Sequence, residues 1–162
     1  LPLVAEDLGL LSPGVDVLRK ASGLPGMAVL QFGFGGPPEG NPHFPANITA
    51  DRVVYTGTHD NDTVVGWYAQ ASAEERTRVE AVFGAMDAPH IALAEAALAS
   101  PGIAAFIPVQ DLLGLGAEAR FNTPGNPQGN WGWRMSDLQL TTLAAAAGAW
   151  KQRLKATRRL SA

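Results

Sequence analysis

Short apolar runs that end in acidic side chains constrain the fold of this chain more than any other feature. The run Leu3-Val4-Ala5-Glu6-Asp7 ends in an acid pair, and the same layout recurs at Val53-Val54-Tyr55-Thr56-Gly57-Thr58-His59-Asp60. These runs are continuously apolar rather than alternating, which is typical of parallel strands buried on both faces of a sheet. Ligands of such folds bind at the carboxyl ends of the strands. The sequence therefore predicts an α/β fold with one site at its strand ends.

Apolar spacing, capping residues and breakers predict that strands and helices alternate along the chain. Strands are expected over residues 1–5, 27–34, 52–56 and 102–109, and helices over 13–21, 63–70, 89–99 and 111–116. Ser72 and Glu75 have capping-box spacing, and the helix behind them is expected to bury Val79, Val82, Phe83 and Met86. A terminal helix is expected to bury one apolar face, which is formed by Leu143, Ala147, Trp150 and Leu154. Four parallel strands would make half of an eight-stranded barrel.

Composition excludes several classes of function. A chain of 162 residues with 46% hydrophobic residues can form one domain, and a net charge of −3 gives no reason to expect nucleic acid as a partner. The absence of cysteine excludes disulfides and thiolate metal sites, and it leaves the redox compartment undetermined, with the cytoplasm as the default location. No apolar run approaches the roughly 18 residues of a membrane span, and no signal peptide is visible. The chain starts at Leu1 rather than Met, which suggests a fragment or a processed product.

The candidate site residues leave several interpretations open. Glu6 beside an apolar wall could act as a general acid, or it could be stabilised by the N–H groups of a helix N-terminal loop. Asp7 could cap the next turn. The segment His59-Asp60-Asn61-Asp62 could bind sugar hydroxyls, hold a divalent cation or form an Asx-rich turn. The segment Asn130-Trp131-Gly132-Trp133-Arg134 offers rings that could stack on sugars or pack a loop over the strand ends.

Taken together, the motifs resemble amylomaltase, the bacterial 4-α-glucanotransferase that is related to the plant disproportionating enzyme. The similarity runs in the same order from about residue 4 to residue 135. The segments that carry it are Ala5-Glu6-Asp7-Leu8-Gly9, Gly23-Leu24-Pro25-Gly26-Met27, Val29-Leu30-Gln31-Phe32, Tyr55-Thr56-Gly57-Thr58-His59-Asp60-Asn61-Asp62-Thr63, Gly66-Trp67-Tyr68, Gln110-Asp111-Leu112-Leu113-Gly114-Leu115-Gly116, Asn122-Thr123-Pro124-Gly125 and Asn130-Trp131.

This resemblance implies that residues 1–162 are the C-terminal part of one catalytic (β/α)8 barrel, with strands five to eight and their helices. It implies that Glu6 is the general acid/base and that Asp60 is the third acid, which grips sugar hydroxyls with His59 beside it. Asp7, Phe32 and Asn130 would line the donor and acceptor subsites. The implied partners are α-1,4-glucans and maltooligosaccharides of starch and glycogen metabolism, with no cofactor, metal or membrane.

The family's nucleophile, an Asp at the end of strand four, would lie before Leu1. A retaining mechanism needs two carboxylates about 5 Å apart, so this chain alone is expected to be inactive without the N-terminal half of the barrel. Two alternatives belong to other classes: a carbohydrate-binding module without catalysis, and a metal-dependent hydrolase built on His59, Asp60 and Asp62.

Overall fold

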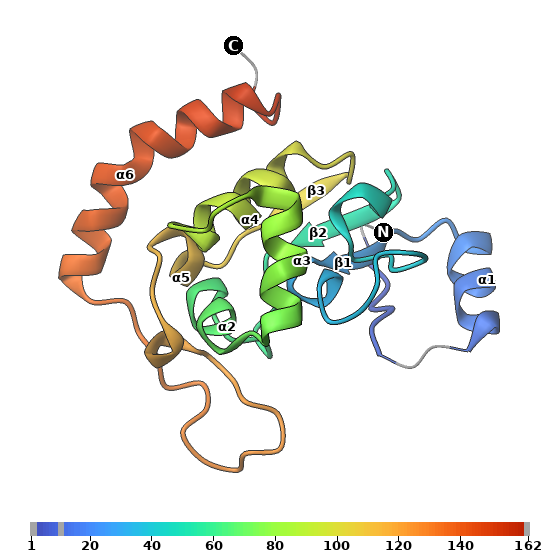
Figure 1. Cartoon of the computed structure of the whole chain (residues 1–162), viewed down its shortest axis with the longest axis horizontal. Coiled ribbons are helices and arrows are strands. Elements are labelled where there is room, and N and C mark those ends of the chain that lie inside the picture. The colour runs from blue at the N-terminus through green and yellow to red at the C-terminus, as the bar shows by residue number, and fades with distance from the viewer. Residues whose placement is uncertain (1–2, 10–11, 161–162) are drawn as a thin grey trace.

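The computed structural model describes residues 3–9 and 12–160 and contains a three-stranded parallel sheet in the order β1-β2-β3 (Figure 1). The strands are β1 (Gly26–Val29), β2 (Arg52–Tyr55) and β3 (Ala104–Phe106). Met27 pairs with Val53, which in turn pairs with Ala104. The predicted α/β fold with a parallel sheet is therefore confirmed.

Helices connect and cover these strands. Their bounds in the described part of the chain are α1 Pro13–Ala21, α2 Val64–Gln70, α3 Ala73–Phe83, α4 Pro89–Ala99, α5 Val109–Leu112 and α6 Asp137–Ala156, with 3-10 turns at η1 Leu30–Gly33, η2 Pro45–Asn47 and η3 Ala117–Ala119. Helix α4 packs against α2, α5 and α6. In Figure 1, α1 and α6 lie on opposite sides of the body formed by the sheet and helices α2 to α4.

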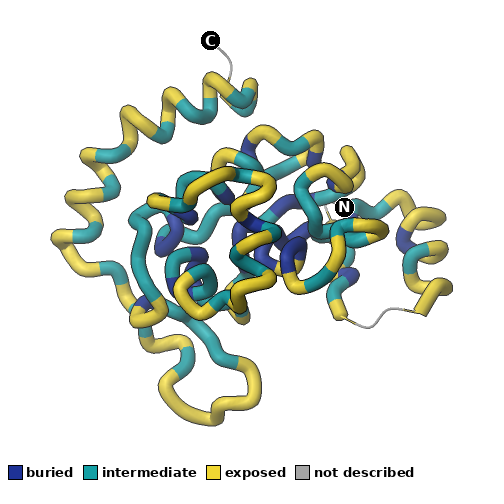
Figure 2. The backbone as a smooth tube through the Cα atoms, viewed as in Figure 1, coloured by how far each residue is buried: buried dark blue, intermediate teal, exposed yellow. Residues whose placement is uncertain are grey.

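The core forms where the sheet meets α2 and α4, and the buried parts of the tube in Figure 2 gather there. Ala28 of β1, Val54 of β2, Val64 of α2 and Leu93 of α4 are all fully buried. The adjacent Val53 is also buried. Since neighbouring side chains of a strand point to opposite faces, β2 is covered on both sides, as its unbroken apolar run indicated.

The expected strand over residues 1–5 is not present in its described part, and residues 1 and 2 lie outside the described residues. Leu3, Val4 and Ala5 have no regular secondary structure, and Leu3 and Val4 are exposed. Ala5 N donates a hydrogen bond to Pro25 O over 2.8 Å, so the segment runs close to the start of β1. Residues 3–5, the described part of this segment, therefore follow the sheet without forming a strand of it.

Two other strands are shorter than predicted. The strand expected over 27–34 ends at Val29 and turns into η1, where a Cβ on Gly33 would lie only 2.7 Å from His43 O. The strand expected over 102–109 ends at Phe106, because Pro108 has no N–H for a ladder and precedes α5 as its N-cap. Both strands therefore lead directly into turns at the same end of the sheet.

The predicted apolar face of α3 is correct in part. The capping box of Ser72 and Glu75 is present, Val79 is fully buried, and Phe83 and Met86 pack against the core. Val82 is 40% exposed, contrary to the prediction. The helix stops at Phe83 because Gly84 adopts a φ of 77°.

The terminal helix α6 exists as predicted but buries none of its residues. Of its expected apolar face, Leu143, Trp150 and Leu154 are half-buried, whereas Ala147 is exposed. Arg153 Nε pairs with Glu95 of α4 over 2.9 Å, and Leu138 at the other end is 76% exposed. None of the helices among residues 3–9 and 12–160 is long and apolar enough to cross a membrane.

The stability of the turn after β1 is expected to depend on pH through His43. Its Nδ1 accepts a hydrogen bond from Val29 N over 3.2 Å, which requires that nitrogen to be unprotonated. Burial, and then the charge of Arg52, lower the pKa of His43 below its usual value, while Asp7 opposes them. Since the folded state binds this proton less readily than the unfolded state, the contribution is complete above about pH 6.5 and is lost as pH falls through the lowered pKa.

This expectation is tested with His43→Gln, which cannot titrate. The melting temperatures of the full-length protein and of its variant should differ most near neutral pH, and the difference should shrink as the pH is lowered. A difference that stays constant over that range would show that protonation of His43 does not affect folding.

Candidate active site

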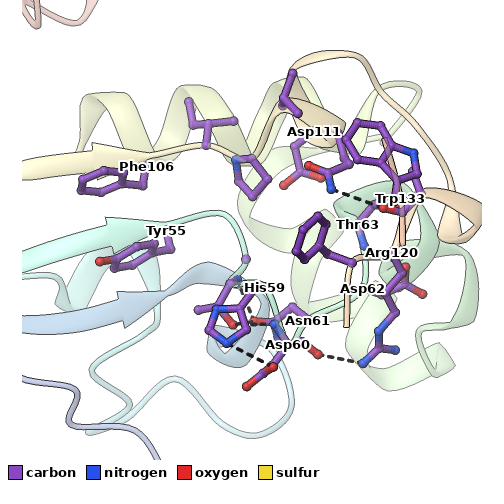
Figure 3. A pocket seen from close by; sticks show the side chains of 18 of the residues that line it. Tyr55, His59, Asp60, Asn61, Asp62, Thr63, Phe106, Asp111, Arg120 and Trp133 are labelled. Carbon is purple, nitrogen blue, oxygen red and sulfur yellow. Dashed lines mark hydrogen bonds and ion pairs between the residues drawn. The ribbon is translucent and has the colours of Figure 1, made fainter. Parts of the chain in front are cut away.

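A cavity of about 620 Å³ opens at the carboxyl ends of β2 and β3. Glu6, His59, Asp60, Asp111, Arg120 and Trp133 are among its lining residues. The rings of Tyr55 and Phe106, from the ends of the two strands, stack with centroids 5.4 Å apart and form part of the wall. Figure 3 shows His59 and Asp60 at one side of this cavity, with Arg120 and Trp133 on another. A cavity therefore lies at the strand ends, where the sequence predicts a site.

His59 and Asp60 belong to the loop of residues 57–63, which joins β2 to α2. Asn61 N donates a hydrogen bond to Thr58 O over 3.2 Å, which closes residues 58–61 as a turn. Asn61 Oδ1 accepts hydrogen bonds from Thr58 N and from Thr58 Oγ1, each over 2.8 Å, and supports this turn. Gln31 Nε2 donates to Asp62 O over 2.9 Å from the turn after β1. The turn interpretation and the ligand-binding interpretation are therefore compatible, because the turn is what displays the two side chains.

Asp60 is held by residues from a distant part of the chain. Asn122 Nδ2 donates to Asp60 Oδ1 over 2.5 Å, and Arg120 Nη2 donates to Asp60 O over 2.7 Å. His59 Nε2 lies 3.3 Å from the same carboxylate, and its ring lies 5.3 Å from that of Trp131. Both His59 and Asp60 keep exposed side chains, of 60% and 47%, so they remain free to meet a ligand.

The local sequence does not mark Arg120 as a site residue, and it marks Asn122 only as the first residue of a motif that resembles amylomaltase. Its contact with Asp60 spans 62 positions, and such a pairing cannot be read from local spacing.

Glu6 lines the same cavity, whereas its neighbour Asp7 does not appear there. Asp7 is 8% exposed and its Oδ1 accepts a hydrogen bond from Met27 N over 2.7 Å. Its Oδ2 is bound by Arg52 Nη1 and lies 3.3 Å from Arg19 Nε. Both oxygens of this carboxylate are therefore engaged by other parts of the protein. The structure makes Asp7 an anchor beneath Glu6 rather than a member of the cavity wall.

Removing the charge of Asp7 is expected to destabilise the protein. Asp7→Asn leaves the buried guanidinium of Arg19 and the largely buried guanidinium of Arg52 without their shared carboxylate, at a cost of about 3 kcal/mol. Chemical denaturation measures the loss of unfolding free energy. An unchanged unfolding free energy in Asp7→Asn would contradict this anchoring role and would favour the binding role that the resemblance implies.

The two other predicted binding residues also lie outside the cavity wall. Phe32 is 44% exposed and meets the ring of His43 edge-on at 5.6 Å. Asn130 uses its side chain within its own loop: Oδ1 accepts from Thr123 N over 2.9 Å, and Nδ2 donates to Asn126 O over 2.8 Å. The structure therefore brings Glu6, His59 and Asp60 together, and it leaves Asp7, Phe32 and Asn130 apart from them.

The interpretation of the acidic loop as a metal site has no geometric support. In the part of the chain that the structure describes, no group of three or more His, Cys, Asp or Glu side chains is arranged to hold a metal ion. Asp62, the third residue of that hypothesis, instead accepts from Thr63 N over 2.7 Å and from Gln70 Nε2 over 3.2 Å. Its carboxylate therefore stabilises the start of α2.

Comparisons with known proteins agree on one family. The model of the 4-alpha-glucanotransferase family matches residues 1–141. Over 83% of its own length, the chain is 47% identical to the chloroplastic/amyloplastic 4-alpha-glucanotransferase DPE1 of Arabidopsis thaliana. Over 87% of its own length, it is 46% identical to the 4-alpha-glucanotransferase of Thermus thermophilus. The amylomaltase of Streptococcus agalactiae, solved in complex with acarbose, superposes on 97% of the chain with a TM-score of 0.83 at 29% identity.

The matched regions are only part of these relatives. The chain spans 24% of the Arabidopsis protein, 30% of the Thermus protein and 31% of the Streptococcus structure. The resemblance found in the sequence motifs is confirmed by matches that cover most of this chain. The chain belongs to the 4-alpha-glucanotransferase family.

Proposed function

We propose that the protein containing this chain transfers segments of α-1,4-glucan to an acceptor glucan by a retaining double displacement. The observation that carries the proposal is that Glu6, His59 and Asp60 line one cavity at the strand ends of a chain from this family. We further propose that residues 1–162 form the second half of a (β/α)8 barrel, with strands five to eight. Acarbose in the similar Streptococcus structure supports a maltooligosaccharide as the ligand.

In this mechanism Glu6 moves the protons. As a general acid it protonates the glycosidic oxygen that leaves, while a nucleophilic Asp from the upstream part of the protein attacks the anomeric carbon. The bond formed is a glycosyl ester on that Asp. Glu6 then removes the proton from the hydroxyl of an incoming glucan, whose oxygen displaces the ester and regenerates the starting α linkage.

Asp60 and His59 stabilise the distorted sugar ring between these two steps. The negative charge of Asp60 favours the positive charge that develops on the ring, and its position is set by Asn122 and Arg120. Phe121 and Trp133 add apolar walls that suit the faces of sugar rings. Such walls favour a glucan acceptor over water, as a transferase requires.

The edges of the structure support the proposal that another half is needed. Phe106 and Ile103, on and beside strand β3 at one edge of the sheet, are 56% and 59% exposed. Leu3 and Val4 near the other edge are also exposed. Open sheet edges that expose large apolar side chains favour association with another surface, and the rest of the barrel would cover both edges. We therefore propose that the chain alone is inactive.

A non-catalytic carbohydrate-binding module is the second candidate function. The aromatic residues and the amide groups around the cavity would serve binding as well as catalysis. Glu6 separates the two functions, because a carboxyl group that transfers protons is unnecessary for binding alone.

The test is incubation with maltotriose, followed by chromatography of the products. This chain, the upstream half of the protein and their mixture are compared. Glucose and a ladder of longer maltodextrins should appear only with the mixture. A ladder from this chain alone would place the nucleophile within it, and binding without any ladder from the mixture or the full-length protein would favour the binding module.

A further inference from the structure

Asp111 is the most deeply buried acid that the proposed mechanism does not use. It lies in α5 and is 1% exposed. Burial raises the pKa of its carboxyl, which the hydrogen bonds from Thr56 and Val64 N partly offset, and the charge of Asp62 adds to the rise. A carboxyl group in such a position is costly unless its partners are well placed. Its presence therefore needs an explanation other than core packing.

The two oxygens of Asp111 bind the two ends of the active-site loop. Asp111 Oδ2 accepts a hydrogen bond from Thr56 Oγ1 over 2.6 Å, directly after β2. Asp111 Oδ1 accepts from Val64 N over 2.8 Å, at the first residue of α2. The residues between these two contacts are the loop of residues 57–63, which carries His59 and Asp60. One side chain therefore sets the distance between the points where that loop begins and ends.

The same geometry excludes a direct chemical role. Both oxygens of Asp111 already accept hydrogen bonds, from Thr56 and Val64. Asp111 is among the residues that line the cavity, but only 1% of it is exposed. Further hydrogen bonds hold the middle of the loop. Arg120 donates to Asp60 O, Gln31 donates to Asp62 O, and Thr58 donates to Asn61 Oδ1. Asp111 is the buried anchor that complements them.

We propose that Asp111 is a positioning residue for His59 and Asp60, acting through its hydrogen bonds to Thr56 and Val64. This inference rests on the proposed function, because it assigns Asp111 to the same site. The effect should appear in kcat more than in KM, since a small displacement of a group that acts in the transition state lowers the rate steeply.

The test uses the full-length protein with Thr56→Val, which keeps the shape of the side chain and removes the hydroxyl donor. Substitution of Asp111 itself could prevent folding, so the milder change is preferred. Thr56→Val should lower kcat for maltotriose about tenfold, and Thr56→Ser, which retains the hydroxyl, should restore most of it. Thr77→Val is the matched control, because Thr77 Oγ1 binds Ala73 O on the exposed face of α3.

A double-mutant cycle separates positioning from a general loss of folding. If the hydrogen bond acts by placing Asp60, Thr56→Val should lower kcat much less in an Asp60→Asn background than in the wild type. An equal factor in both backgrounds, or a wild-type kcat in Thr56→Val, would overturn the inference.

Amide hydrogen exchange gives a readout that does not depend on activity. Peptides covering residues 57–63 should exchange faster in Thr56→Val than in Thr56→Ser or Thr77→Val. Unchanged exchange there would overturn the inference even if kcat fell. A full-length wild type without transfer activity would refute the proposed function, while the exchange result would still decide whether Asp111 holds the loop.

Discussion

Glu6→Gln in the full-length protein is expected to lower the rate of maltotriose disproportionation by about 10³-fold. The amide keeps the size of the carboxyl group but can neither donate the proton to the leaving oxygen nor remove one from the acceptor. Steady-state kinetics with product chromatography measures the rate. Glucan binding, measured by calorimetry, should stay within a few-fold of the wild type, because Glu6 is one of many residues around the cavity.

Glu74→Gln is a suitable control for this substitution. Glu74 is an exposed residue in the first turn of α3, so the same chemical change there should leave the rate unaltered. A turnover near that of the wild type in Glu6→Gln would refute the acid/base assignment and would favour a role in binding alone.

Asp60→Asn is expected to lower kcat by about 10²- to 10³-fold while KM changes much less. The substitution removes the negative charge that would stabilise the developing positive charge on the sugar ring. Asn122 can still donate to the remaining side-chain oxygen, so the loop should keep its shape. Rate measurements over a range of maltotriose concentrations separate kcat from KM.

Asp62→Asn provides a comparison within the same loop. Its carboxylate binds Thr63 N and Gln70, so neutralising it should affect the start of α2 more than the chemistry. If Asp60→Asn raised KM and left kcat intact, Asp60 would be a binding residue without a transition-state role. An equal loss of kcat in both variants would show that the loop's total charge, rather than Asp60 itself, is what matters.

The prediction of the fold from the sequence was most accurate where local signals were strong. Helix α1 has the predicted bounds, and the capping box of Ser72 and Glu75 is present. The predicted ends of the strands were less accurate, because a strand end depends on contacts with residues that are distant in the sequence. The strand after Gly26 stops at Val29 where His43 binds its backbone, and no pattern within residues 27–34 records that contact.

The acid pair Glu6 and Asp7 shows the same difference between local signals and long-range contacts within the candidate site. Both residues are suitable for sugar chemistry by type, and both follow an apolar run. In the structure Glu6 lines the cavity, whereas the Asp7 carboxylate binds Met27 N and Arg52. Local sequence could not say which one, because the choice depends on where Arg19 and Arg52 lie in the folded chain.

The sequence by itself determined the family and the parallel α/β order, since these follow from motifs and from apolar runs. It placed Glu6, His59 and Asp60 among six candidate site residues but did not separate them from Asp7, Phe32 and Asn130. Only the tertiary structure decided that Asp7 is an anchor, that Asn122 and Arg120 hold Asp60, and that Asp111 joins both ends of the active-site loop. The physical reason is that hydrogen bonds between side chains depend on distances in space. Those distances are set by packing of the sheet against its helices, which brings residues far apart in the chain into contact.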